Sequence, residues 1–479
     1  MGKELETVIG LEVHVQLDTK SKIFCSCSTG FGALPNTNIC PVCCGYPGVL
    51  PVLNKKALFL ALRVCLALNC RVNRRIYFER KNYFYPDLPK NYQISQYALP
   101  LGEDGFLLIP SGREIRIKRV HLEEDAGKLI HRKDYSLVDF NRAGIPLLEI
   151  VSYPDINSPQ EAFDYLTQLK LTLQYIGAST CDMEKGYLRC DANISLRKKG
   201  ESKLGTKVEL KNMNTFRGVR DALEYEVKRQ TKIIEKGDKI YQETRLWDSS
   251  QGKTFSMRRK EEAHDYRYFP EPDLVDFKIE EEWLEKERSL IGELPLTRKK
   301  RILKDYQLQE GEAEVVVSSK WLADFFEEAC VYFKDYKKIA SWLIGPFLEI
   351  FYAEGGDWDK VKVTPKNFSK VVRYFSTGKL NNLGAKKVLA KIFTTNADVD
   401  KVIEEEGLVQ VSCEEELTKF VDEAIVANPN PVNDYLKGKQ QAVMFLVGWV
   451  MKKSRGKANP KVVREILEKK LREKGGKDG

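Results

Sequence analysis

A carboxylate and an imidazole lie two positions apart in the stretch Val8–Leu17. Apart from Gly10, apolar and polar residues alternate there with a period of two, the pattern of a strand with one buried face. On such a strand Glu12, His14 and Gln16 share the polar face. A carboxylate beside an imidazole can begin a metal site or an acid/base pair. A half-solvated edge strand has the same pattern, so this stretch alone leaves both readings open.

Acidic side chains recur in later segments that are otherwise apolar or tightly turned. Glu123, Glu124 and Asp125 follow the alternating stretch Ile115–Leu122, and adjacent carboxylates repel one another unless a cation neutralises them. On a solvated loop this repulsion would be weak. The other members of the set are Glu149, in the apolar run 146–151, and Asp191 and Glu209, on two further alternating stretches. With His14, these residues predict a concave sheet whose inner face binds one or two divalent ions.

Two cysteine pairs, Cys25 with Cys27 and Cys40 with Cys43, have the spacing of a tetrahedral zinc site. Four sulfur ligands leave no open position for substrate, so we interpret the site as structural zinc bound in a loop at residues 25–43. Cys44 is a spare fifth thiol. A pair of disulfides is the alternative, and we disfavour it because the other cysteines are scattered singly, as in a reducing compartment.

Two stretches, residues 80–93 and 265–273, combine prolines, aromatic rings and cations. Prolines exclude regular secondary structure, so we expect rigid loops. Such loops can stack a base and neutralise phosphate, or they can simply seal a core. From these stretches and from polar positions elsewhere we select candidate nucleotide contacts: Lys81, Asn82, Tyr83, Arg189, Lys207, Arg245 and Arg258. Carboxylates that hold Mg²⁺ beside such cations are the components of phosphoryl transfer. The chain lacks the GxxxxGK[ST] motif, which excludes a P-loop.

The order of elements predicts an α+β protein. A chain of 479 residues is too long for one core. Alternating strands dominate up to Pro272, with helices expected at 54–68 and 159–176, and amphipathic helices follow from Leu294. We therefore expect a mixed-sheet domain at 1–293 and two all-helical domains at 294–408 and 409–479.

Charge and hydropathy narrow the possible partners. The longest apolar run, 442–451, is too short to cross a bilayer, and the charged opening residues do not resemble a signal peptide. We expect a cytoplasmic protein with no membrane contact. Residues 451–479 carry eleven Lys or Arg against four Asp or Glu, within a net charge of +9. This basic excess predicts a nucleic-acid partner, although a solvated tail has the same composition.

Long motifs distributed along the whole chain resemble one known family. They are IGLEVHVQL, NYFYPDLPKNYQISQ, HLEEDAGK, NRAGIPLLEIV, LRCDANISLR, VELKNMNTF and DYRYFPEPD, in that order. They are similar to the B subunits of the bacterial aspartyl/glutamyl-tRNA amidotransferases. The resemblance implies a cradle distantly like the catalytic fold of glutamine synthetase. It also implies ATP-dependent phosphorylation of the side-chain carboxylate on Glu-tRNA(Gln) or Asp-tRNA(Asn), followed by amidation with ammonia. The A subunit, an amidase, would release the ammonia, and a small C subunit would bind both.

Carried over by motif, the resemblance assigns the Mg²⁺ ligands to Glu12, His14, Glu124 and Glu149, with Asp191 and Glu209 as further catalytic candidates. Spacing does not separate Glu123 from Glu124, and the resemblance favours Glu124. It gives Gln16 no role. The expected cofactors are ATP, Mg²⁺ and structural Zn²⁺. Two other functions remain open at this point: a tRNA-binding scaffold with a structural acidic cluster, and a metal-dependent phosphoesterase acting on RNA.

Overall fold

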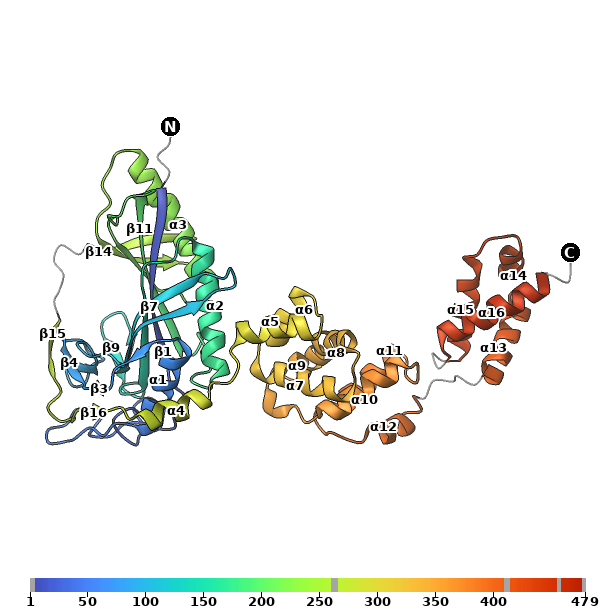
Figure 1. Cartoon of the computed structure of the whole chain (residues 1–479), viewed down its shortest axis with the longest axis horizontal. Coiled ribbons are helices and arrows are strands. Elements are labelled where there is room, and N and C mark those ends of the chain that lie inside the picture. Colours follow the sequence, from blue (N-terminus) through green and yellow to red (C-terminus); the bar gives the residue numbers. More distant parts are fainter. Residues whose placement is uncertain (1–4, 260–265, 409–413, 455–457, 476–479) are drawn as a thin grey trace. The chain divides into compact units, whose positions relative to one another are not determined.

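The computed structural model describes residues 5–259, 266–408, 414–454 and 458–475. It divides into two compact units, Met1–Arg298 and Lys299–Gly479. The first unit is built on a large mixed sheet, and the described part of the second is helical (Figure 1). The expected combination of an N-terminal mixed sheet with a helical C-terminal region is confirmed.

Nine strands form the main sheet, in the order β14-β13-β12-β11-β1-β10-β7-β6-β2. All neighbours are antiparallel except β12 and β13. The strands are β1 (Leu5–Gln16), β2 (Arg71–Val72), β6 (Gly102–Leu108), β7 (Glu114–Glu124), β10 (Pro146–Ser152), β11 (Leu188–Lys198), β12 (Val208–Lys211), β13 (Glu243–Asp248) and β14 (Lys253–Arg259).

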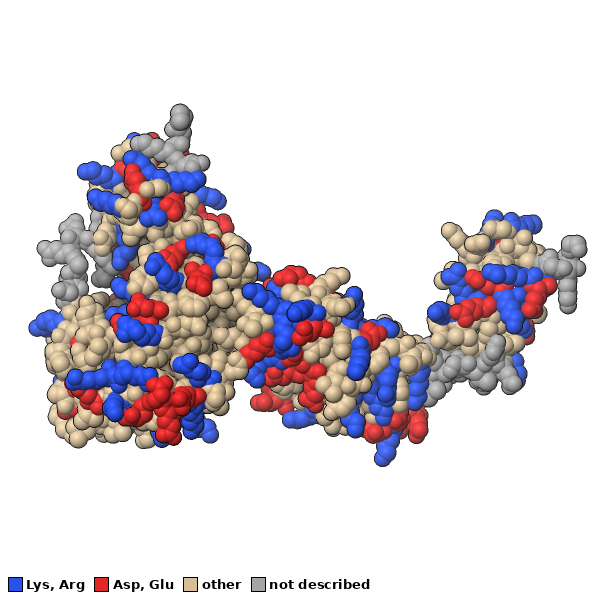
Figure 2. All heavy atoms as spheres, viewed as in Figure 1, with Lys and Arg blue, Asp and Glu red and all other residues tan. Residues whose placement is uncertain are grey.

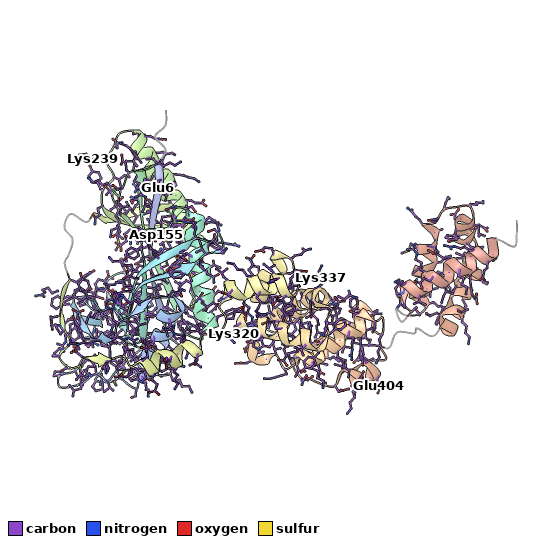
Figure 3. All side chains as sticks on the ribbon, in the orientation of Figure 1. Glu6, Asp155, Lys239, Lys320, Lys337 and Glu404 are labelled. Atoms are coloured by element: carbon purple, nitrogen blue, oxygen red, sulfur yellow. The ribbon has the colours of Figure 1, made fainter. Side chains whose placement is uncertain are left out.

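Strand β1 lies at the centre of this sheet. Its register with β11 runs nearly the whole length of the strand. Glu6, labelled in Figure 3, lies near the N-terminal end of β1 and forms an ion pair with Arg197 (2.9 Å). Leu11, Val13 and Val15 are buried on one face, as the alternation predicts. The half-solvated edge strand is therefore the wrong reading, because β1 has a partner on each side.

Three helices cover the apolar face of the sheet: α1 (Lys55–Ala67), α2 (Pro159–Tyr175) and α3 (Phe216–Glu235). Asn54, Ser158 and Thr215 cap them by accepting hydrogen bonds from backbone N–H groups of the first turn. A single hydrophobic core joins the helices to the sheet. The opposite face of the central strands is left for polar side chains. A fourth helix, α4 (Glu281–Ser289), packs against α1.

A second sheet of three strands contains parts of both proline- and aromatic-rich stretches. Its order is β15 (Arg267–Pro270), β4 (Glu79–Asn82) and β5 (Tyr92–Ser95). The prediction of irregular loops is wrong at these positions. The prolines of the first stretch lie in the turn between β4 and β5, where they remove no ladder hydrogen bond, and Pro270 ends β15. Two short ribbons complete the unit: β3 (Arg75–Ile76) with β16 (Phe277–Lys278), and β8 (Lys128–His131) with β9 (Ser136–Asp139).

All the named elements of the second unit, within its described residues, are helices. Helix α5 (Pro295–Asp305) leads into this unit. The helical elements that follow are α6 (Glu310–Val317), α7 (Lys320–Tyr332), α8 (Tyr336–Trp342), a π-helical turn (Leu343–Phe347), α9 (Leu348–Ala353), a 3₁₀ turn (Trp358–Lys360), α10 (Pro365–Ser376), α11 (Asn382–Phe393), α12 (Val399–Glu405), α13 (Glu414–Ala427), α14 (Pro429–Leu436), α15 (Ala442–Lys453) and α16 (Pro460–Gly475).

Two hydrophobic clusters lie within these helices. One is formed by residues from Ile302 to Ile403 and the other by residues from Leu417 to Leu471. The division into two helical domains near residue 408 stays a prediction, and residues 409–413 lie outside the described part. None of the described helices combines the length and apolarity that a bilayer crossing requires.

Candidate functional site

The polar face of the central strands gathers carboxylates and imidazoles from four neighbouring strands. In the sheet register His14 lies opposite Glu149, and Glu149 lies opposite His121 on β7. Glu12 lies opposite Asp191 on β11. Because directly opposed residues in antiparallel strands point to the same face, the register alone brings these side chains together.

Two histidines and three carboxylates form the centre of this face. The Nε2 atom of His14 lies 3.4 Å from Glu149, 3.5 Å from Glu123 and 3.7 Å from Glu12. The Nε2 atom of His121 lies 3.5 Å from Glu149 and 3.7 Å from Glu123. Glu12, His14 and Glu149 form one set of donor atoms within 4.8 Å of one another, and His121, Glu123 and Glu149 form another. Either set could hold a divalent cation through oxygen and nitrogen ligands.

The electrostatics of this cluster favour a cation at its centre. Burial lowers the pKa of His14, but the hydrogen bond to Glu149 and the charges of Glu123, Glu149 and Glu12 raise it to about 9. Burial also raises the pKa of Glu149, and the two histidines outweigh this and hold it well below its usual range. Burial and the charge of Glu149 raise the pKa of Glu12. A proton on His14 therefore neutralises part of the carboxylate charge, and a bound metal ion would provide the same neutralisation.

The structure brings Glu123, and not Glu124, to this cluster. Adjacent residues on a strand point to opposite faces, and Glu123 shares the parity of His121. Glu124 forms an ion pair with Lys90 and accepts a hydrogen bond from the backbone N–H of Ile94 at 2.8 Å. Our assignment of a metal ligand at this position therefore moves from Glu124 to Glu123.

Two functional candidates were missed from the sequence. His121 is buried, and the alternation of the stretch that contains it places it on the same face as Glu123, which is the signal that could have found it. Lys211 follows Glu209 by two residues and so lies on the same face of β12. Its Nζ atom forms ion pairs with Asp191 (2.5 Å) and with Glu209 (3.3 Å). Asp191 and Glu209 therefore bind a lysine beside the cluster.

The three-stranded sheet supplies aromatic and cationic groups near the cluster. The Nζ atom of Lys81 lies 4.9 Å from the ring centre of Tyr266, whose ring lies 5.5 Å from that of Tyr83. Burial and then the charge of Glu123 raise the pKa of Tyr83, and the charge of Lys81 lowers that of Glu149. Both effects require Lys81 and Tyr83 to lie close to the carboxylates. The Ser95 hydroxyl donates to Glu123 at 3.4 Å.

The remaining nucleotide candidates lie in four different surroundings. Arg189 lies opposite His14 in the register and donates to Asp125 at 2.9 Å, so it borders the cluster. Lys207 is exposed just before β12. Asn82 donates to the backbone carbonyls of residues 80 and 267 and so fastens β4 to β15. Arg258 lies on β14, but its side chain is outside the described residues.

Arg245 does not lie on the polar face. Its guanidinium donates to Glu243 (2.7 Å) and lies 3.1 Å from Glu226, a fully buried residue of α3. Thr254 accepts two further hydrogen bonds from it. Arg245 thus belongs to an ion network that fixes α3 to β13 and β14, and its selection as a nucleotide contact is corrected.

The four cysteines converge as their spacing predicts. The sulfur atoms of Cys25, Cys27, Cys40 and Cys43 lie within 4.8 Å of one another, and those of Cys40 and Cys43 are 3.9 Å apart. A tetrahedral zinc ion with bonds of about 2.3 Å separates its sulfur ligands by about 3.8 Å. The donor set and its spacing fit zinc, and the predicted convergence of these four cysteines into a cluster that could bind a metal is confirmed.

Comparison with known proteins defines the class of the chain. Residues 7–285 match the family model described as the GatB/GatE catalytic domain, and residues 324–471 match the one described as the GatB domain. The aspartyl/glutamyl-tRNA(Asn/Gln) amidotransferase B subunit of Carboxydothermus hydrogenoformans is 50% identical over 477 residues, which are 98% of this chain and 99% of that protein. The B subunit of Persephonella marina is 52% identical over 473 residues, 98% of this chain and 100% of its own. The chain belongs to the family of aspartyl/glutamyl-tRNA amidotransferase B subunits.

The raised pKa of His14 predicts a pH dependence of stability. A pKa raised from 6.5 to about 9 on folding stabilises the protein fully below pH 6.5, and this contribution disappears as pH rises through 9. We compare the free energy of unfolding of the wild type with that of His14→Gln in protein freed of divalent ions. The excess of the wild type should be larger near pH 6 than near pH 9.5, by about 2 to 3 kcal/mol. Urea denaturation at both pH values measures this. His131→Gln, an exposed histidine, is the control, and equal differences at the two pH values would contradict the prediction.

The placement of Arg245 predicts a structural role. Replacing it with Met removes its ion pair with the buried Glu226 and its hydrogen bond to Glu243, while Arg229 still pairs with Glu226 (2.8 Å). We expect a loss of about 2 kcal/mol in the free energy of unfolding. Urea denaturation of Arg245→Met tests this, with the more exposed Arg220→Met on α3 as the matched control. A stability equal to that of the control would remove the structural role.

Proposed function

We propose that this chain is the kinase and transamidase subunit of a tRNA-dependent amidotransferase. It phosphorylates the side-chain carboxylate of glutamate on tRNA(Gln), aspartate on tRNA(Asn), or both, and ammonia then displaces the phosphate. The observation that carries this proposal is the cluster of His14, His121, Glu12, Glu123 and Glu149 on one face of the sheet. The names of the relatives supply the substrate class.

The chemistry needs what this face offers. A carboxylate is a poor electrophile at neutral pH, and conversion to an acyl phosphate gives it a leaving group. The donor set fits Mg²⁺, with Glu12, His14, Glu123 and Glu149 as ligands and His121 beside them. When bound, the ion neutralises phosphate charge. Lys211, held by Asp191 and Glu209, and Arg189, held by Asp125, place cations at the border of the same face.

The three-stranded sheet is our candidate for the nucleotide. Lys81 and the rings of Tyr83 and Tyr266 provide a cation and stacking surfaces beside the carboxylates. Arg189 and Lys207 remain candidates for binding the phosphates. Arg258 also remains a candidate, on the basis of its position on β14 only. In this proposal the first unit is a cradle like the catalytic fold of glutamine synthetase, residues 294–408 and 409–479 are separate helical domains, and the cysteine site holds structural Zn²⁺.

The proposal includes partners. A separate amidase, the A subunit, releases ammonia from glutamine, and a small C subunit joins the two in a cytoplasmic heterotrimer. The basic tail contacts the tRNA body. On the visible face of α13–α16, cationic side chains are mixed with anionic ones (Figure 2), so the tail contact is assigned to exposed cations such as Lys461, Lys469 and Arg472.

The ATP-dependent step can be tested with substitutions in the cluster. Assembled with its amidase and small subunits, the wild type should release phosphate from ATP only with mischarged tRNA. We expect Glu149→Gln and Glu123→Gln to lower this rate by about 100-fold or more, because each removes a ligand charge. Phosphate release and Mn²⁺ binding are measured together.

Glu114→Gln, an exposed residue of the same strand as Glu123, is the control. Glu124→Gln should leave Mn²⁺ binding intact, because the structure pairs Glu124 with Lys90. Unchanged phosphate release in both cluster variants would favour the tRNA-binding scaffold, and tRNA cleavage without ATP would favour the phosphoesterase.

The tail is tested through charge alone, since α16 contributes Val463, Leu467 and Leu471 to a hydrophobic cluster and cannot be removed without loss of that core. Replacing Lys461, Lys469 and Arg472 with Gln should weaken tRNA binding and reduce the salt slope by about 2, because each phosphate contact contributes about 0.7 to 0.9. Titrations at several salt concentrations measure it. The exposed residues Lys320, Lys334 and Lys337 of the same unit, replaced together, are the control. Equal slopes in both triple variants would exclude a tail contact.

A further inference from the structure

Lys22 is a fully buried lysine beside the cysteine cluster. Its Nζ atom lies 3.5 Å from the Cys43 sulfur and donates to the backbone carbonyl of Phe140 at 3.2 Å. Among the described residues no aspartate or glutamate forms an ion pair with it. Lysines are almost never buried to this extent without an anionic partner. The group in hydrogen-bonding contact with it that can carry negative charge is the Cys43 thiol.

The surroundings hold Lys22 in this position. Its backbone N–H donates to the carbonyl of Cys27 at 2.9 Å, and the next backbone N–H, of Ile23, donates to Gly144 at 2.9 Å. Gly144 has a positive φ of 83°, and a Cβ atom there would lie 3.5 Å from both the Lys22 side chain and Cys43. The Lys22 stem and Cys43 therefore both pack beside Gly144, and the positive φ of Gly144 favours glycine at this position.

The charge of the metal site explains why a cation is buried there. Metal binding requires thiolates, and four thiolates around Zn²⁺ leave a net charge of −2. One ammonium inside the fold halves that charge. Its N–H···S hydrogen bond also withdraws electron density from the Cys43 sulfur.

We propose that Lys22 is the internal counter-cation of the cysteine metal site and that it sets how tightly the site holds zinc. The proposal rests on the cysteine cluster being a zinc site and is independent of the phosphorylation chemistry. Lys22 acts through Cys43 as a positioning residue and does not contact the metal.

Zinc affinity of the full-length chain tests the proposal, by competition with a chromophoric chelator. Lys22→Met should weaken zinc binding by about 10- to 100-fold, the usual range for loss of a partner to a metal ligand. Lys22→Gln removes the charge but keeps a donor, so its affinity should fall between those of Lys22→Met and the wild type. Lys20→Met, an exposed lysine two residues away, is the matched control. Cys40→Ser should lose the zinc.

Cobalt substitution separates this role from simple packing. Loss of the ammonium should shift the sulfur-to-Co²⁺ charge-transfer band of Lys22→Met to lower energy, because the thiolate becomes a better electron donor. A variant that is only less stable would keep the band in place. Unchanged affinity together with an unchanged band would overturn the proposal. A wild type that binds no zinc would instead show that the cysteine cluster is not a zinc site.

An experiment on the wild type covers the case in which the variants do not fold. With zinc bound, Lys22 should resist acetylation by acetic anhydride, and removal of zinc with a chelator should make it reactive, as followed by mass spectrometry. Lys20 should react in both states. Continued protection of Lys22 after zinc removal would mean that the cysteine site does not control its burial, and would reject the proposal.

Discussion

The antiparallel register of β1 with its two neighbours is the constraint on which the polar face with the His–Glu cluster depends. It sets His14 opposite both Glu149 and Arg189, and Glu12 opposite Asp191. A shift of one residue in either pairing would turn the polar side chains of the shifted strand into the hydrophobic core. The apolar face prevents that shift, because Leu11, Val13 and Val15 are buried beneath α1, α2 and α3. Burial on one face thus determines the geometry of charges on the other.

Charge neutralisation follows the same logic at several places on this chain. A carboxylate that is buried away from water is stable only beside a cation, and the buried carboxylates described here have different cationic partners. Glu226 has Arg229 and Arg245, Glu124 has Lys90, and Asp125 has Arg189. Glu149 and Glu123 have the two histidines as their partners within the described cluster, and histidine can exchange its proton for a metal ion. This distinguishes the central cluster from the structural ion pairs around it.

Period-two alternation was sufficient to predict which strands contribute to the site, since it identifies the polar face of each strand separately. It predicted Glu12 and His14 on one surface, Glu149 was predicted as a carboxylate that interrupts an apolar run, and the cysteine spacing predicted the cysteine cluster. It could not choose between Glu123 and Glu124, because the choice depends on where β7 ends and on a partner, Lys90, distant in sequence. Arg245 was misassigned for a similar reason: its neighbour Thr244 faces Glu209, and only the packing of α3 shows that Arg245 lies on the other side.

The buried lysine beside the cysteines and the protonated histidine among the carboxylates are complementary consequences of one electrostatic rule. In the cysteine site the protein supplies a lysine, Lys22, whose ammonium lies against the Cys43 sulfur. In the acidic cluster the internal cation is His14, whose raised pKa reflects a charge that it would have to give up to bind the proposed metal ion. A permanent counter-ion suits a metal that stays in place, and a titratable one suits a metal that exchanges with its nucleotide. The two sites therefore differ in how their charge is balanced, as they differ in proposed role.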